Sequence, residues 1–422
     1  MKAYPNYIEQ KSLLAGRYPS HWKMVRNRVI FVPKKELVGT DSSKYDLLSL
    51  TTNGIILRDI ESGKGKFPKD FDTYQVVRPG EMVFCLFDVD ETPRTVGLSE
   101  KTGMVTGAYD VFTINDGFAP GFVNYYYTAV DNVKAFRPYY TGLRKVVKKD
   151  KFMQIYVPVP PKAEQDKIIA FLDEQLTQIE KCKILKEKEL QSLNELKLAE
   201  ISKVVTRGLN PRCPLKDSGI PWIGNIPAHW DVKRAKYMWG KEKREVRPED
   251  KVITCFRDGQ VTLRENRRTT GFTESITEIG YQGIRKGDLV IHQMDAFAGS
   301  IGVSDSDGKG TSVYHCCTPK GDYDPEYYAF TLREMARTGF IQSLYRGIRE
   351  RSSDFNFQTF GKQYLPVPPF GEQRQIVQFI KGRTQSIDTM ITSLRAEIER
   401  LTEYKQRLIS DVVTGQINVQ DE

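Results

Sequence analysis

An internal repeat limits what this chain can fold into more than any other feature of its sequence. From Tyr156 the chain reads YVPVPPKAEQDKIIAFL, and from Tyr364 it reads YLPVPPFGEQRQIVQFI. The spacing of 208 residues between these two segments holds without a gap as far as Thr206 and Thr414. Because two copies are too few for a solenoid, we predict two similar units within one chain.

The segments upstream of each conserved stretch also match, but they differ far more. The best match pairs the YPSHW segment that ends at Trp22 with the IPAHW segment that ends at Trp230. Shorter matches pair Asn53-Gly54 with Asp258-Gly259, and Gly142-Leu143-Arg144 with Gly347-Ile348-Arg349. Each half is therefore a variable globular part followed by a conserved part. The boundaries that we predict are 1–155 and 209–363 for the globular parts, and 156–208 and 364–422 for the conserved parts.

The globular parts contain short β-branched and aromatic runs that are bounded by glycine turns. Two of these runs are Val83-Phe84-Cys85-Leu86-Phe87 and Leu289-Val290-Ile291-His292, and both predict strands. We therefore expect mixed α/β domains with much strand, and an α+β fold class for the whole chain. We interpret Trp22 and Trp230 as core anchors, with His21 and His229 beside them in structural positions.

Each conserved part predicts one long helix. Pro160-Pro161 precedes the first stretch and Gly208 follows it, while Pro368-Pro369 and Gly415 flank the second. Proline ahead of a helix and glycine behind it is the expected asymmetry, and both stretches are rich in helix-forming residues. About 45 residues at about 1.5 Å each give a helix of roughly 65 Å. A helix of this length needs a partner of similar length.

The obvious partner for each helix is its copy. Antiparallel pairing would make a coiled coil and a pseudo-two-fold molecule, and it suits a single chain whose second globular part is built between the helices. Apolar residues at spacings of three, four and seven mark the stripe that we expect to pair. They are Leu172, Leu176, Ile179, Leu190 and Leu193 in the first helix, and Ile387, Ile391, Leu394, Ile398, Leu401 and Leu408 in the second. The alternative, in which both helices pack on a separate partner, stays open.

The positive charge of the chain lies outside the predicted helices. The chain has 63 Lys and Arg against 54 Asp and Glu, a formal net charge of +9. Residues 162–206 carry a net charge of −1 and residues 370–414 a net charge of +1, so the two helices cancel. Basic globular parts on neutral helices favour a nucleic-acid surface on the globular parts.

Clusters of basic and amide side chains in predicted loops are the candidates for contact with DNA. Arg, Asn and Gln can read base edges, while Lys and Arg neutralise phosphates. The candidates are Arg58, Arg144, Lys145, Arg264, Asn266, Arg267, Arg268, Arg346, Arg349 and Arg351. For any one cluster an ordinary solvated surface is an alternative, and the match between the segments around Arg144 and Arg349 favours those two arginines.

No motif of the sequence predicts catalysis. There is no phosphate-binding G-x-x-x-x-G-K-[ST] loop, nucleophile elbow, zinc set or calcium-binding loop. The Val367-Pro368-Pro369-Phe370 segment has valine where an amino-methyltransferase would need Asn or Asp. We therefore predict that the chain is not an enzyme and binds no cofactor or metal of its own.

Several segments resemble the DNA specificity subunit of type I restriction–modification systems. The most specific is the DSGIPWIGNIPAHW stretch that ends at Trp230, which resembles the start of a target recognition domain in that family. The two P-V-P-P-x-x-E-Q segments, which end at Gln165 and Gln373, match as well, and so do the long helices that follow them. The resemblance covers essentially the whole chain, and the motifs are specific in combination.

The resemblance implies two target recognition domains separated by two conserved helices that pair antiparallel. Each domain would read one half of a split site on double-stranded DNA, and the helices would set the gap between the halves. The helices would also dock two copies of an adenine-N6 methyltransferase subunit, and an endonuclease/translocase subunit could join. Catalysis, with S-adenosylmethionine, ATP and Mg²⁺, would belong to these partners. Because the two globular parts differ widely, we expect an asymmetric target.

Two other classes of protein remain as alternatives. A fused restriction–modification enzyme would need methylase or nuclease motifs, for which the length leaves no room. A coiled-coil adaptor that binds only proteins would differ by lacking salt-dependent DNA affinity. The chain has no apolar run of membrane-spanning length and no apolar stretch typical of a signal peptide, so we expect a cytoplasmic protein without membrane contact.

Overall fold

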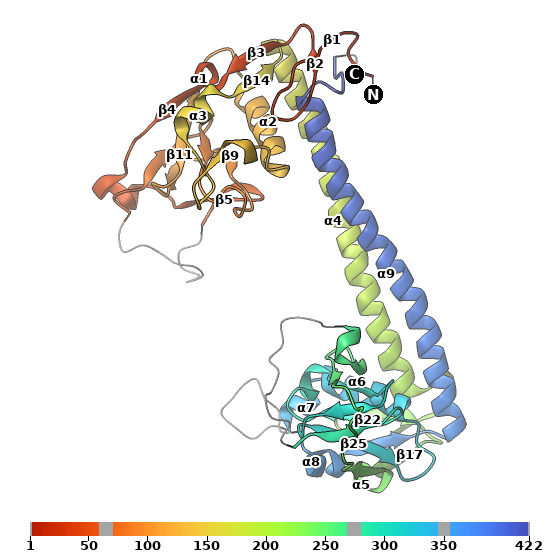
Figure 1. The fold of residues 1–422 in the computed structure, drawn as a ribbon. Helices are drawn as coiled ribbons and strands as arrows, with labels where there is room; N and C mark the ends of the chain where they lie inside the picture. Colours follow the sequence, from red (N-terminus) through yellow and green to blue (C-terminus); the bar gives the residue numbers. More distant parts are fainter. Residues whose placement is uncertain (1, 59–70, 268–279, 345–354, 421–422) are drawn as a thin grey trace. The chain divides into compact units, whose positions relative to one another are not determined.

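The computed structural model describes residues 2–58, 71–267, 280–344 and 355–420. The chain divides into two compact units. Unit 1 comprises Met1–Glu187 and Arg395–Glu422, and unit 2 comprises Lys188–Leu394. Each unit contains one globular domain together with part of both long helices (Figure 1). Among the described residues, no helix is long and apolar enough to cross a membrane.

The two predicted long helices are present as α4 (Lys162–Arg207) and α9 (Phe370–Val413). Each begins directly after a proline pair, as predicted. Each ends one or two residues before a glycine in the left-handed region, Gly208 with φ of 69° and Gly415 with φ of 70°. A left-handed glycine lets the chain leave the helix without a Cβ clash, so the sequence signals for both helix ends are confirmed.

The two helices pair antiparallel within each unit. Ion pairs join them in such an order that rising residue numbers on α4 meet falling numbers on α9. In unit 1 the pairs are Glu180 with Lys405 and Lys186 with Glu397; in unit 2 they are Lys197 with Asp388 and Glu200 with Arg383. The predicted antiparallel pairing is therefore confirmed.

The domain of unit 1 has a four-stranded antiparallel sheet with strand order β4-β11-β8-β9. These strands are β4 (Phe31–Lys34), β11 (Asp110–Ile114), β8 (Met82–Phe84) and β9 (Val96–Leu98). Two-stranded ladders pair β1 (Tyr7–Ile8) with β2 (Tyr18–Pro19), β3 (Lys23–Arg26) with β14 (Tyr156–Val159), β5 (Leu48–Thr51) with β6 (Gly54–Leu57), β7 (Gln75–Val77) with β10 (Gly103–Val105), and β12 (Tyr140–Thr141) with β13 (Val146–Val147). The helices are α1 (Asn27–Ile30), α2 (Pro120–Asn132) and α3 (Lys149–Gln154), with short 3₁₀ turns at Gly39–Lys44 and Arg137–Tyr139.

The domain of unit 2 repeats this plan. Its four-stranded antiparallel sheet has the order β18-β25-β22-β23, from β18 (Trp239–Glu242), β25 (Tyr314–Pro319), β22 (Leu289–His292) and β23 (Ile301–Val303). Ladders pair β15 (Leu215–Asp217) with β16 (Asn225–Pro227), β17 (Asp231–Arg234) with β26 (Tyr364–Val367), β19 (Ile253–Cys255) with β20 (Val261–Leu263), and β21 (Gln282–Ile284) with β24 (Gly308–Gly310). The helices are α5 (Ala235–Met238), α6 (Pro325–Arg337), α7 (Phe340–Ser343) and α8 (Phe357–Lys362), with 3₁₀ turns at Arg264–Asn266 and Ala296–Ala298.

The predicted mixture of strand and helix is confirmed, and the repeat extends to strand order. The predicted strand at Leu289–His292 is β22. The predicted strand at 83–87 is shorter than expected, because β8 ends at Phe84 and Cys85 then bonds to Thr95 in the neighbouring segment. The low sequence similarity of the two globular parts therefore hides one shared topology.

The two domain cores are filled differently. Unit 1 buries a cluster of aromatic rings whose centroids lie 4.9–6.1 Å apart, formed by Phe31, Phe84, Phe112, Tyr127, Phe136 and Phe152. Unit 2 buries Met238, Trp239, Cys317, Tyr327 and Tyr328 in the corresponding core. Both cores include residues of the long helices, such as Leu172 and Val412 in unit 1, and Val205 and Ile380 in unit 2.

The residues predicted to pair the long helices are buried or half-buried. The buried ones are Leu172, Ile179, Ile387, Ile391, Leu394 and Leu408. The half-buried ones are Leu176, Leu190, Leu193, Ile398 and Leu401. In unit 1, Leu172, Ile179 and Leu408 belong to the domain core, so this end of the stripe serves the domain as well as the helix pair.

Candidate nucleic-acid interface

The conserved motifs form a joint between each globular domain and its long helix. In unit 1 the centre of the joint is the Glu164 carboxylate, whose side chain is only 2% exposed. It accepts hydrogen bonds from the Trp22 indole N–H at 3.0 Å and the Tyr4 hydroxyl at 2.6 Å, and its second oxygen lies 2.8 Å from His21 Nε2. Burial and the bond to Glu164 raise the pKa of Tyr4 well above its ordinary value. Three donors thus satisfy one buried carboxylate.

Unit 2 builds the same joint with one donor fewer among the described residues. Glu372 accepts from the Trp230 indole N–H at 3.1 Å, and His229 Nε2 lies 2.8 Å away. The Glu372 side chain is 21% exposed. The predictions that Trp22 and Trp230 anchor the core are confirmed, since they are 3% and 0% exposed. His21 and His229 lie in matched positions in the two joints, as predicted.

The glutamine after each glutamate bonds to the residue directly before the domain helix, α2 in unit 1 and α6 in unit 2. Gln165 Oε1 accepts from Ala119 N at 2.7 Å, while Nε2 donates to Pro160 O at 3.0 Å. Gln373 repeats this with Asp324 N at 2.8 Å and Pro368 O at 2.8 Å. Gln165 and Gln373 therefore hold the N-cap residues of α2 and α6 at the start of α4 and α9.

Arg144 and Lys145 lie in the turn of the β12–β13 hairpin. The turn uses positive φ at Gly142 (68°) and at Lys145 (44°), and it leaves Leu143 fully exposed to solvent. Arg144 bonds to Asp88 at 2.6 Å, and its guanidinium carbon lies 5.2 Å from the centroid of the Phe87 ring. Lys145 lies 3.2 Å from Asp90 and 3.3 Å from Glu91.

These acidic partners change the electrostatics of the hairpin. Hydrogen bonds to Asp88 and to Asp90 raise the pKa values of Arg144 and Lys145, which therefore stay charged. However, the carboxylates cancel the charges that the sequence had suggested as a bare basic patch. Exposed ion pairs contribute only about 0–1 kcal/mol, so a phosphate could compete for these cations.

The unit 2 candidates gather around the β19–β20 hairpin. Arg267 bonds to Asp258 at 2.7 Å, and its guanidinium carbon lies 4.2 Å from the centroid of the Phe256 ring. Asn266 donates to the Thr262 hydroxyl at 2.8 Å, and Arg264 Nε lies 3.4 Å from the Thr254 hydroxyl. Arg264, Asn266 and Arg267 thus occupy one short segment whose geometry the hairpin fixes.

The other candidates are less informative. Arg58 follows β6, is half-buried, and donates its backbone N–H to Leu47 O at 2.9 Å. Arg268, Arg346, Arg349 and Arg351 lie outside the described residues. The proposed match between the hairpin of Arg144 and the segment of Arg349 therefore has a structural description in unit 1 alone.

A matched pair of exposed side chains was missed by the sequence analysis. Arg26 lies over the ring of Tyr156 at 4.9 Å, and Arg234 lies over the ring of Tyr364 at 5.0 Å. Tyr156 and Tyr364 are each 46% exposed. The signal was present, since these tyrosines open the two repeat segments and the arginines share their spacing of 208 residues.

A second missed feature is a cavity in unit 2 lined by three arginines. Arg257 lies next to Asp258, and Arg333 and Arg337 lie one turn apart on α6. The helical spacing of Phe330, Arg333 and Arg337 would have placed them on one face. Among the described residues, no group of three or more His, Cys, Asp and Glu side chains could hold a metal ion.

Two solved structures resemble this chain along almost its whole length. One is a chain from a structure of a type I R-M system, solved to explain its complex assembly and conformational transition. It is 15% identical, with a TM-score of 0.66 over 95% of this chain and 99% of that one. The other is the crystal structure of the HsdS subunit from Thermoanaerobacter tengcongensis, 14% identical, with a TM-score of 0.53 over 95% of this chain and 98% of that one.

No protein-family model matches the chain. At 14–15% identity, the likeness is one of fold. The chain therefore has the fold of type I restriction–modification proteins that include the HsdS subunit of Thermoanaerobacter tengcongensis.

Proposed function

We propose that this chain is the DNA specificity subunit of a type I restriction–modification system. The observation that carries the proposal is the contrast within the repeat. The Trp–Glu contact at the centre of each joint is the same, Trp22 with Glu164 and Trp230 with Glu372, while the domains that the joints carry differ in their cores and loops. A shared frame with divergent domains suits two readers of different sequences, and the fold of an HsdS subunit supports this interpretation.

Each domain, in this proposal, reads one half of a bipartite asymmetric site on double-stranded DNA. Arg144 and Lys145 in unit 1, and Arg264, Asn266 and Arg267 in unit 2, are the candidate contacts among the described residues. Arg144 and Arg267 are the strongest of them, because an aromatic ring and an aspartate restrict the planar guanidinium of each. A restricted guanidinium suits bidentate recognition of a guanine edge.

The long helices, in this proposal, set the gap between the half-sites and dock two copies of an adenine-N6 methyltransferase subunit. An endonuclease/translocase subunit completes the restriction complex. The chain itself supplies no catalysis, and S-adenosylmethionine, ATP and Mg²⁺ act in the partners. The matched Arg26–Tyr156 and Arg234–Tyr364 pairs support docking of a partner in two copies, since a repeated exposed feature suits a repeated partner.

Genome-wide adenine methylation, measured in the source cell with this gene intact and deleted, tests the proposal. We expect deletion to remove methylation from one split, asymmetric adenine motif and to leave every other motif unchanged. An unchanged methylome, in a cell where the partner subunits are expressed, would contradict the proposal. A coiled-coil adaptor would additionally show no salt-dependent DNA affinity in the purified complex, whereas phosphate contacts give a steep dependence.

A further inference from the structure

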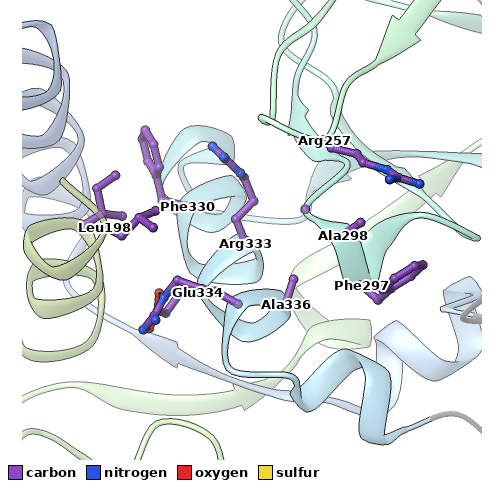
Figure 2. A pocket seen from close by; sticks show the side chains of 11 residues that line it. Leu198, Arg257, Phe297, Ala298, Phe330, Arg333, Glu334 and Ala336 are labelled. Carbon is purple, nitrogen blue, oxygen red and sulfur yellow. Dashed lines mark hydrogen bonds and ion pairs between the residues drawn. The ribbon is translucent and has the colours of Figure 1, made fainter. Parts of the chain in front are cut away.

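The arginine-lined cavity of unit 2 has the size of a small-molecule site. Its volume is about 340 Å³, within the usual range for ligand pockets. Its apolar walls come from Leu198 and Ile201 of α4, from Phe330 of α6, and from Phe297 in the 3₁₀ turn before β23. In Figure 2 the side chains of Phe330 and Arg333 extend from α6, and Arg257 lies on the facing segment.

Two of the three arginines in the cavity already have carboxylate partners. Arg337 makes two hydrogen bonds to Glu334, at 2.6 and 2.7 Å, and the Ser202 hydroxyl also donates to Glu334 at 2.6 Å. Arg257 bonds to Asp295 at 3.1 Å. These two ion pairs leave little net charge, so they form the polar rim of the cavity without a free cation.

Arg333 is different, because it has no hydrogen-bond or ion-pair partner among the described residues. Its Nε atom is buried and makes no hydrogen bond. Burial lowers the pKa of its guanidinium, although the Asp258 carboxylate opposes this effect. Asp258 is itself engaged by Arg267 at 2.7 Å. A largely buried guanidinium without a partner is costly to the fold unless a ligand completes it.

The guanidinium of Arg333 lies close to the hairpin across from it. Gly259 has φ of 89°, and a Cβ atom there would lie 2.5 Å from an Arg333 terminal nitrogen. The guanidinium thus lies against bare backbone in the turn between β19 and β20. The same turn carries Arg257 and Asp258, so Arg333 lies beside the segment that holds the unit 2 DNA candidates.

We propose that this cavity binds a phosphate group, with Arg333 as its principal ligand and with Phe297 and Phe330 against the remainder of the bound molecule. The planar guanidinium fork matches the geometry of phosphate oxygens, and in a partly desolvated site such charge-assisted bonds are strong. The phosphate comes either from a free nucleotide or from the DNA backbone. The second source rests on the proposed function, whereas the first does not.

The positions of unit 1 that match the three arginines of this cavity carry no arginine. Aligning the two hairpin turns and the first residues of α2 and α6 places Thr52, Thr128 and Asn132 opposite Arg257, Arg333 and Arg337. Tyr125, which stands opposite Phe330, bonds instead to Asp173 of α4. Within the described residues, the arginines that form the phosphate site therefore belong to unit 2.

Titration of the full chain, purified with any subunit that it needs for solubility, with inorganic phosphate and then with AMP tests the proposal directly. We expect saturable binding that weakens at least tenfold in Arg333→Met. Arg247→Met is the matched control, because Arg247 is an exposed arginine of the same unit that pairs with Asp307. Equal binding by wild type and Arg333→Met, or none by wild type, would overturn the proposal.

Thermal unfolding separates loss of the site from loss of the fold. Without phosphate, Arg333→Met should melt at or above the wild-type temperature, because the substitution removes an unpartnered buried charge. Added phosphate should raise the melting temperature of the wild type and of Arg247→Met but not that of Arg333→Met. Equal stabilisation of Arg333→Met by phosphate would also overturn the proposal.

The salt dependence of DNA binding by the complex distinguishes the two sources. A DNA phosphate in the cavity predicts that Arg333→Met lowers the slope of log affinity against log salt by about 0.9. A free nucleotide predicts an unchanged slope with lost AMP binding. If wild type itself shows no salt-dependent DNA affinity, the proposed function fails, while the phosphate titration still decides the cavity.

Discussion

Units 1 and 2 share one sheet topology and similar joints, but they differ in their core residues and in the side chains on their surfaces. The sheets share one strand order, and Trp22, Glu164 and Gln165 have counterparts in Trp230, Glu372 and Gln373. In contrast, the aromatic cluster of unit 1 centres on phenylalanines and that of unit 2 on Trp239, Tyr327 and Tyr328, and within the described residues the three arginines of the cavity have no counterparts in unit 1. The retained part attaches a domain to a helix, and the varied part is free to serve a different ligand in each unit.

The joints themselves are not equally buried. Glu164 has three hydrogen-bond partners and is 2% exposed, while Glu372 has two among the described residues and is 21% exposed. Tyr4 supplies the extra donor in unit 1, and it comes from the N-terminal segment, which also meets the chain after α9 through the Tyr7 hydroxyl and Gly415 O at 2.8 Å. The same motif is thus reinforced in unit 1 by residues outside it.

The largest expected effect comes from placing a charge inside the helix pair. Ile391 in unit 2 is 6% exposed, whereas Leu401 in unit 1 is half-buried. An unpaired buried charge costs about 3–5 kcal/mol, so Ile391→Glu should unfold the pairing, with Leu401→Glu following at a smaller cost. Denaturant unfolding and co-purification with the methyltransferase subunit measure this. An intact complex with Leu401→Glu would contradict the role of the helices in assembly.

The next effect tests the inequality of the joints. Glu164→Ala leaves the two buried donors, Tyr4 and Trp22, unsatisfied and should cost about 3 kcal/mol, while Glu372→Ala should cost about 1–2 kcal/mol because water reaches that site. Hydrogen exchange, measured separately over each domain, would report the loss. Tyr4→Phe should shrink the difference between the two substitutions. If Glu164→Ala and Glu372→Ala cost the same free energy of unfolding with and without Tyr4→Phe, the Tyr4 hydroxyl would not stabilise the unit 1 joint.

A smaller effect is expected from the matched exposed tyrosines. Tyr156→Ala and Tyr364→Ala should leave the unfolding free energy within about 0.5 kcal/mol, since both side chains are half exposed. If each docks one copy of a common partner, each substitution should weaken one of two binding events about fivefold to tenfold. Analytical ultracentrifugation with the methyltransferase subunit would resolve the two events. Tyr237→Ala, at another exposed tyrosine of unit 2, is the control.

The smallest expected effect concerns the hairpin tip of unit 1. The Leu143 side chain is fully exposed to solvent, so Leu143→Ser should not change the free energy of unfolding measurably. Under the proposed function it should weaken DNA binding by about 1 kcal/mol, through loss of an apolar contact with a base. Fluorescence anisotropy at fixed salt would measure it. Unchanged affinity would remove this hairpin from the DNA surface.

The long helices were predictable from sequence, whereas the charge pattern of the domains was not. Pro160-Pro161 and Gly208 bound α4 because proline and glycine act locally on the backbone. The neutralisation of Arg144 depends on Asp88, which is 56 residues distant, so only the fold brings the two together. For the same reason, the repeated P-V-P-P-x-x-E-Q motif singles out Glu164 and Gln165 but does not reveal their partners Trp22 and Ala119. Arg333 was missed because a sequence does not show which buried arginine lacks a hydrogen-bond partner among the described residues.

The central claim is that each unit reads its own half of one DNA site. Methylation of a randomised target library by complexes that carry Arg144→Gln in unit 1 or Arg267→Gln in unit 2 tests it most directly. We predict that Arg144→Gln relaxes sequence preference in one half-site only, and Arg267→Gln in the other half-site only, with losses of about 1–3 kcal/mol at the affected base. Relaxation of the same half-site by both substitutions, or of both halves by either one, would contradict the account.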